Sequence, residues 1–170
     1  MGSGEIVNRV ANSVLVTIDL EDYYPSGERV LFDIKNWLHE GLVLREKEFR
    51  ALVDAHDWSV YTNQFIALQC TSDAIIPGWA YMLVRLKLSG IAKQVVVGNL
   101  EALETALYQL IIADLDLGYC ENKPVIIKGC SNKPVPQNAY LFLIDRLHPI
   151  AKSIMYGEAC SSVPLYKKNK

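Results

Sequence analysis

The chain has 170 residues, of which 51% are hydrophobic and 21% are charged, and this composition excludes intrinsically disordered and fibrous classes. Seventeen basic residues against nineteen acidic ones give a net charge of −2, which excludes an electrostatic nucleic-acid binder. No apolar run approaches the roughly 20 residues of a membrane-spanning helix, and no secretory signal is visible. We expect a soluble, cytoplasmic protein that binds neither nucleic acid nor a membrane; a homo-oligomer is compatible with the sequence.

Residues 1–60 predict an N-terminal α+β extension that packs on the main sheet. Its first element is an apolar, β-branched run typical of a strand, and a stretch rich in turn residues follows. Two short amphipathic segments then predict helices. The expected elements are a strand over 14–20, a turn over 21–27, and helices over 32–40 and 45–56.

Residues 61–170 predict an α/β core, and together with the extension they predict a single domain. Four short apolar runs lack alternation, which is typical of parallel strands buried on both faces. Helix-length segments separate the runs, and right-handed crossovers would place these helices on both faces of the sheet. The sequence therefore predicts one small, Rossmann-like open sheet that is mostly parallel. Its strands are expected at 65–70, 94–98, 125–129 and 153–157, with helices at 77–88, 99–111 and 136–147.

Three of the four cysteines follow predicted strands. Cys70, Cys130 and Cys160 lie at or just beyond the carboxyl ends of three runs, whereas Cys120 lies in a connection at the opposite edge. Because the carboxyl ends of parallel strands meet at one edge, where α/β proteins bind ligands, we expect these three thiols to share a pocket. No C-x-x-C pair occurs, so reduced thiols are favoured over a dithiol or a zinc ribbon.

Three interpretations of this cysteine edge are open. The three thiolates, with Asp73 or Glu158 as a fourth ligand, suit zinc or an iron–sulfur centre. Alternatively, Cys130 is a nucleophilic or redox thiol activated by Lys133 and a helix N-terminus. The third interpretation is inert packing, the commonest role of a cysteine in a core.

The loop from Gly129 to Pro136 is a second candidate site. It combines a glycine, hydroxyl and amide donors, a lysine and the start of a helix, a combination that suits a phosphate or carboxylate; an ordinary connecting loop is the alternative. No Walker A, dinucleotide-binding, nucleophile-elbow or H-E-x-x-H motif occurs, so no catalytic residue is assigned and enzymatic activity stays open. The candidate ligand-binding residues are Gly129, Cys130, Ser131, Asn132 and Lys133.

A turn near the amino end carries carboxylates and tyrosines. Asp19, Glu21 and Asp22 are interpreted as a solvated acidic turn rather than as ligands of a hard cation. Tyr23 and Tyr24 in the same turn suit a surface that contacts a partner protein.

Segments across almost the whole chain resemble one known family. They are Thr17–Pro25, Ala74–Pro77, Trp79–Met82, Lys128–Cys130, Lys133–Pro136 and Ser153–Glu158. In these segments the chain resembles an uncharacterised bacterial family catalogued as a domain of unknown function, number 2480. The family offers no catalytic residue to carry over. The resemblance implies, through the neighbourhood of the family's genes, a role beside iron–sulfur cluster assembly, with assembly proteins as partners.

Two main functional hypotheses follow. The first is a non-enzymatic accessory protein of iron–sulfur or thiol metabolism that uses Cys70, Cys130 and Cys160 to hold a metal or receive sulfur. The second is a binding protein or enzyme that holds the anionic group of a small molecule in the Gly129–Pro136 loop. An assembly role for the tyrosine turn is a third. The resemblance favours the first.

Overall fold

The computed structural model describes residues 15–129, 132–158 and 160–168. The chain forms two compact units. Pro25–Leu107 makes one of them, which we call the inserted unit. The other, the discontinuous unit, is made by the described residues up to Tyr24 and from Tyr108 onward. This division differs from the expected boundary at residue 60, because the chain leaves one unit after its first strand and later returns to it.

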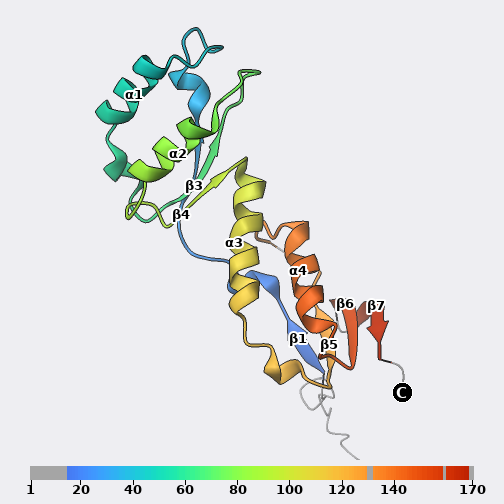
Figure 1. Ribbon diagram of the computed structural model, residues 1–170. Helices are drawn as coiled ribbons and strands as arrows, with labels where there is room; N and C mark the ends of the chain where they lie inside the picture. The colour runs from blue at the N-terminus through green and yellow to red at the C-terminus, as the bar shows by residue number, and fades with distance from the viewer. Residues whose placement is uncertain (1–14, 130–131, 159, 169–170) are drawn as a thin grey trace, which may run out of the picture. The chain divides into compact units, whose positions relative to one another are not determined.

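The inserted unit is built on three parallel strands in the order β2-β3-β4 (Figure 1). The chain alternates strand and helix here, as parallel pairing requires a crossover between neighbouring strands. The elements are β2 (Arg29–Asp33), α1 (Glu46–Ala55), β3 (Phe65–Gln69), α2 (Gly78–Lys87) and β4 (Gln94–Val97), with short 3-10 helices at Ile34–Trp37 and Trp58–Tyr61. The helix α3 (Leu100–Asp114) begins in this unit and ends in the other.

The central strand β3 is buried on both faces, as its continuous apolar run predicted. Ile66 and Leu68 belong to the core cluster that includes the buried faces of α1 and α2. Phe65 and Ala67 face the other way and pack with Leu103 and Leu107 in the first half of α3. Successive side chains of a strand point to opposite faces, so β3 contributes to two cores, one on each side of the sheet.

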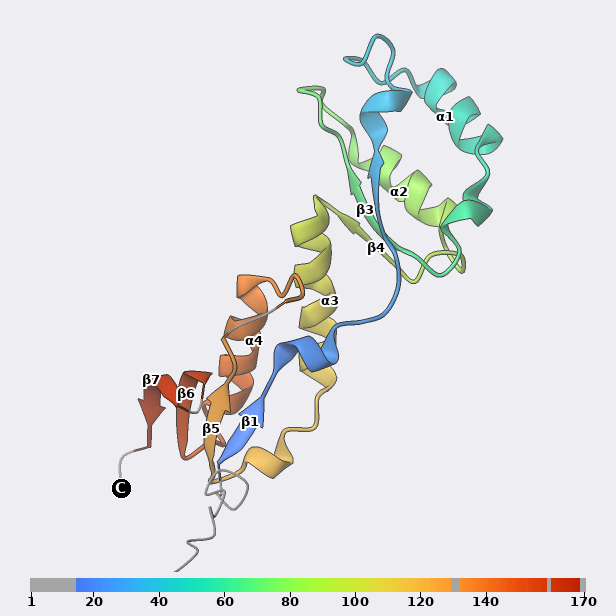
Figure 2. The same cartoon turned by 180° about the vertical axis from the view of Figure 1, so that it is seen from behind.

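The discontinuous unit contains a four-stranded sheet in the order β1-β5-β6-β7, seen from behind in Figure 2. The first three strands are parallel, and β7 pairs antiparallel with β6. Apolar residues of the sheet pack with the second half of α3 and with α4 in one core cluster. The elements are β1 (Val16–Ile18), β5 (Pro124–Ile127), α4 (Gln137–Leu147), β6 (Ser153–Glu158) and β7 (Ser161–Lys167), with 3-10 helices at Leu20–Tyr23 and Gly118–Cys120. No helix among the described residues is long and apolar enough to cross a bilayer.

The structure confirms an α/β fold with mostly parallel strands. The expectation of one sheet is wrong, because β3 and β4 belong to a different sheet from β5 and β6. Strand composition reports burial, but the choice of partner strand depends on contacts far apart in the chain. The predicted helix over 32–40 is also wrong: these residues contain the end of β2 and a 3-10 helix over Ile34–Trp37. Strands β2 and β7 were not expected.

Candidate functional site

The described cysteines do not lie at one sheet edge. Cys70 directly follows β3 in the inserted unit, whereas Cys160 is exposed between β6 and β7 in the discontinuous unit. Cys120 is buried in a 3-10 helix, where burial raises the pKa of its thiol. Cys130 lies outside the described residues. The single-sheet premise that brought Cys70 and Cys160 together is therefore incorrect.

The two proposed carboxylate ligands are divided in the same way. Asp73 is exposed in the loop after β3, and Glu158 ends β6 in the other unit. Cys70 is half-buried against the core of the inserted unit, and its Sγ atom lies 3.2 Å from the Ser72 hydroxyl. Within the part of the chain that the structure describes, no three His, Cys, Asp or Glu side chains are grouped so that they could hold a metal ion.

An ion pair joins the carboxyl ends of β1 and β5. Asp19 follows β1 by one residue and Lys128 follows β5 by one residue. Because Ile18 and Ile127 are register partners in this parallel pair, the next residues of both strands meet at the same edge. Lys128 Nζ donates to Asp19 Oδ2 at 2.7 Å. Asp19 also accepts from the backbone N–H of Glu21 at 3.0 Å, so one carboxylate both pairs with the lysine and begins the 3-10 helix.

Both members of this pair are held in their charged forms. Burial raises the pKa of Asp19, but hydrogen bonds from Lys128 and the Glu21 N–H, with the charges of Lys128 and Lys133, lower it below its ordinary value of 3.8. The hydrogen bond and charge of Asp19 raise the pKa of Lys128, and Glu158 and Asp22 add to this effect. The expected solvated acidic turn is thus a structured one.

The loop after β5 already holds a carboxylate. The side chain of Glu21 accepts hydrogen bonds from the backbone N–H groups of Asn132 and Lys133, the second at 3.4 Å. Lys133 Nζ lies 3.4 Å from the Glu21 carbonyl oxygen and 5.5 Å from the centre of the Tyr24 ring. Two adjacent amides and an ammonium group therefore converge on one acidic residue, in the loop that the sequence selected as an anion site. Ser131 lies outside the described residues.

A tyrosine fixes the start of this loop. The Tyr156 hydroxyl, from β6, donates to the Gly129 carbonyl at 3.2 Å, and the Tyr140 ring meets the Tyr156 ring edge-on at 5.7 Å. A Cβ atom at position 129 would lie 2.7 Å from Tyr156 Cζ. Position 129 therefore requires glycine for space, and the aromatic ring forms a wall beside the loop.

The comparison with known families covers nearly the whole chain. The family model described as "Protein of unknown function (DUF2480)" matches residues 4–168. The chain belongs to this family. No curated protein and no solved structure matches the chain. The resemblance seen in the sequence is confirmed, and the chemistry of this family member has to be argued from its own residues.

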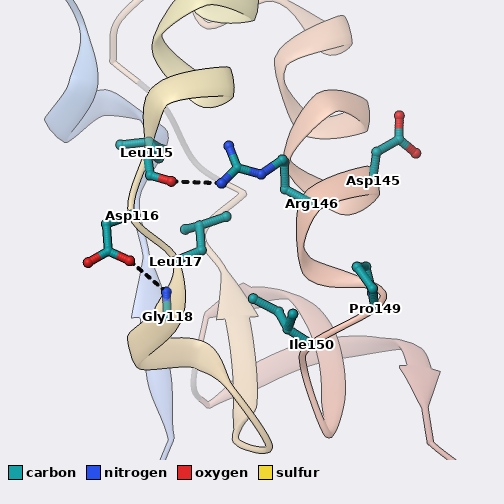
Figure 3. A pocket seen from close by; sticks show the side chains of 8 residues that line it. All are labelled: Leu115, Asp116, Leu117, Gly118, Asp145, Arg146, Pro149 and Ile150. Carbon is teal, nitrogen blue, oxygen red and sulfur yellow. Dashed lines mark hydrogen bonds between the residues drawn. The ribbon is translucent and has the colours of Figure 1, made fainter.

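A shallow pocket of about 410 Å³ lies near the carboxyl ends of α3 and α4, and its lining residues are drawn in Figure 3. Arg146 of α4 donates to the carbonyl oxygens of Ile112, Ala113 and Leu115, the last two at 2.7 and 2.8 Å. Ile112 and Ala113 lie in the last turn of α3, where carbonyls lack the usual intrahelical donor, and Leu115 follows the helix directly. Arg146 therefore closes the end of α3. The arginine here has a structural task, and the pocket is a weaker candidate than the loop after β5.

Sequence reasoning missed Lys128 as a site residue and treated Asp19 and Glu21 as a solvated turn. A usable signal was present, because Asp19 and Lys128 are each the first charged residue after an apolar strand. The Gly129–Pro136 loop was selected in the same way, because ligands bind beyond the carboxyl ends of parallel strands. The missing information was that β1 lies next to β5.

Proposed function

We propose that the protein binds a small molecule through an anionic group, a carboxylate or a phosphate, in the loop after β5. One observation carries the proposal: the N–H groups of Asn132 and Lys133 already bind the carboxylate of Glu21. Adjacent backbone amides that point to one oxygen form the concave donor arrangement used by many anion sites. Glu21 then acts as an internal occupant that a ligand replaces.

Lys128 and Lys133 have different roles in this proposal. Lys128 is bound to Asp19, so its ammonium group sets the position of the strand ends rather than meeting the ligand. Lys133 lies on the loop itself, where its ammonium group is 3.4 Å from the Glu21 carbonyl oxygen and 5.5 Å from the centre of the Tyr24 ring. It would supply the positive charge beside the bound anion. The location at the carboxyl edge of parallel strands is the usual place for a ligand in an open α/β sheet.

The proposal predicts that Glu21 competes with added anions. We would titrate isotope-labelled full-length protein with inorganic phosphate and with succinate, at constant ionic strength set by chloride. The readout is the backbone amide resonances of Asn132 and Lys133. Glu21→Gln weakens the internal competitor and is expected to tighten apparent binding about three- to tenfold, since a site occupied most of the time by its own side chain binds more weakly by that factor.

Matched lysine variants complete the test. Lys133→Ala should abolish the response, while Lys152→Ala, which removes an exposed lysine before β6, should leave it unchanged. The proposal fails if neither phosphate nor succinate shifts the two amides in wild type and in Glu21→Gln. It also fails if both lysine variants respond like wild type, because the binding would then be nonspecific screening.

An accessory role in iron–sulfur or thiol metabolism, with zinc or an iron–sulfur centre as cofactor and assembly proteins as partners, stays a prediction. It now depends on Cys130 and on Cys160, which is exposed. Metal analysis of anaerobically purified wild type, compared with a Cys130→Ser/Cys160→Ser variant, tests it. Equal metal content in the two proteins would end this hypothesis.

A further inference from the structure

The inserted unit leaves one part of its sheet without a helix. Helices α1 and α2 pack on the face that contains Ile66 and Leu68. After β4 the chain crosses to the other face, where α3 packs on Phe65 and Ala67. In a sheet of parallel strands each crossover helix covers part of one face. The helix that follows β4, α3, therefore does not cover β4 on the face where α2 packs.

A groove of about 520 Å³ lies at this uncovered place, between α2 and the last two strands. Met82 and Leu86 of α2 are 68% and 71% exposed, and Val97 at the end of β4 is 58% exposed. Single exposed apolar side chains are ordinary, but several around one hollow mark a binding surface. The groove is lined by Leu68, Tyr81, Met82, Arg85, Leu86, Val95 and Val97.

The lining of the groove carries positive charge and no negative charge. Arg85 is the only charged residue in its lining, and no ion pair joins it to another residue in the described ranges. Lys87, two positions along the same helix, is by contrast paired with Asp54 at 2.9 Å. Burial, with the nearby Cys70 and Asp33, raises the pKa of Tyr81. Its hydroxyl group therefore remains a hydrogen-bond donor at neutral pH.

We propose that this groove binds an amphipathic carboxylate, a straight alkyl chain lying along Met82, Leu86 and Val97 with its head group on Arg85. The volume falls within the roughly 300–1,000 Å³ of small-molecule sites, which are mostly apolar with a few polar groups that orient the ligand. The site lies wholly in the inserted unit and does not depend on the anion loop of the discontinuous unit.

The lining argues against a second copy as the occupant. In a twofold contact the same surface meets itself, so two Arg85 side chains would enter an apolar interface whose lining supplies no carboxylate. Burying unpaired charge in this way is costly. A ligand that brings its own carboxylate removes that cost.

Calorimetric titration of the full chain with decanoate, below its micellar concentration, tests the proposal. Decyltrimethylammonium is the matched probe with the same chain and the opposite charge. We expect decanoate to bind at least tenfold more tightly than the cation. We also expect affinity to rise about fourfold for each methylene between hexanoate and decanoate, because each buried methylene gains a similar transfer free energy.

Three variants locate the site. Arg85→Gln should weaken decanoate binding about tenfold, and Leu86→Glu should abolish it, while Lys47→Gln, an exposed charge on α1, should have no effect. Arg85 and Leu86 are exposed, so these substitutions are expected to leave the fold intact; circular dichroism checks this. Phosphate binding at the other unit should be unchanged in all three.

The proposal is overturned if decanoate gives no heat, if the cationic probe binds equally well, or if Arg85→Gln has no effect. It is also overturned if wild type self-associates with rising concentration and Leu86→Glu alone prevents this, because a second copy then covers the groove.

Discussion

The ion pair between Arg29 and Glu104 should contribute strongly to the stability of the inserted unit. Arg29 begins β2 and Glu104 lies on α3. The pair therefore links the first strand of this unit to the helix that packs on the face opposite α1 and α2. Arg29 Nε lies 2.6 Å from Glu104 Oε1, and Nη2 lies 3.3 Å from Oε2. The side chains are only 12% and 7% exposed, so water screens this pair very little.

We predict that Glu104→Gln lowers the free energy of unfolding of the inserted unit by about 3 kcal/mol, at the lower end of the 3–5 kcal/mol lost when one partner of a buried pair is removed. The lower end applies because the guanidinium keeps other partners: it donates to the carbonyl oxygens of Pro25 and Gly27 at 2.8 and 2.6 Å. It also lies 5.0 Å from the centre of the Phe65 ring. With a denaturant slope of about 2 kcal/mol per molar urea, the midpoint falls by about 1.5 M.

Tryptophan fluorescence during urea unfolding measures this loss directly. The protein has three tryptophans, at positions 37, 58 and 79, and all lie in the inserted unit. Glu46→Gln is the matched control, because Glu46 pairs with Arg50 on the exposed surface of α1, where such pairs contribute about 0.5 kcal/mol or less. If Glu104→Gln costs no more than Glu46→Gln, the burial argument is refuted.

Two further predictions concern the discontinuous unit. The fold lowers the pKa of Asp19 below its ordinary value of 3.8, so its pairing with Lys128 stabilises the unit above that value and is lost as the pH falls through the lower folded pKa. Asp19→Asn should therefore unfold more easily than wild type at pH 7, and the difference between the two thermal melts should narrow as the pH falls below 3.8; a difference that stays constant over this range would contradict the prediction. Arg146→Met removes three hydrogen bonds to the end of α3 and should cost about 2–3 kcal/mol by urea unfolding followed by circular dichroism. Arg146→Lys should recover only part of that loss, because one ammonium group cannot reproduce the planar donor fork; full recovery would show that charge alone is needed.

The elements that were predicted correctly share a local signal. Strands β3, β4, β5 and β6 are short apolar runs, and α2, α3 and α4 follow turn or capping residues at the expected places. Two strands were missed: β2, part of which was predicted as the helix over 32–40, and β7, which has no such signal. Strand β7 is mostly exposed, contains Pro164 and lies at the edge of its sheet, where proline is tolerated and the pattern of burial is weak. Pairing with β6, rather than its own composition, makes it a strand.

The candidate site likewise combines a feature that adjacent residues reveal with contacts that only the fold creates. The Gly129–Pro136 loop was recognisable because it follows a strand and precedes a helix, both of which are written in adjacent residues. The pairing of Asp19 with Lys128 joins residues 109 positions apart, and the Glu21 carboxylate meets the loop across 111 positions. Separations of this size leave no trace in a periodicity or a motif.

The sequence by itself determined that this chain is a mostly parallel α/β protein of its family, because apolar runs and helix caps act between neighbouring residues. Only the tertiary structure decided that there are two sheets, that Cys70 and Cys160 belong to different ones, and that a carboxylate of the chain lies in the anion loop. Strand partnership depends on the free energy of packing the whole chain, in which distant segments compete for the same edge. Tertiary pairing therefore decided which side chains meet at the candidate site.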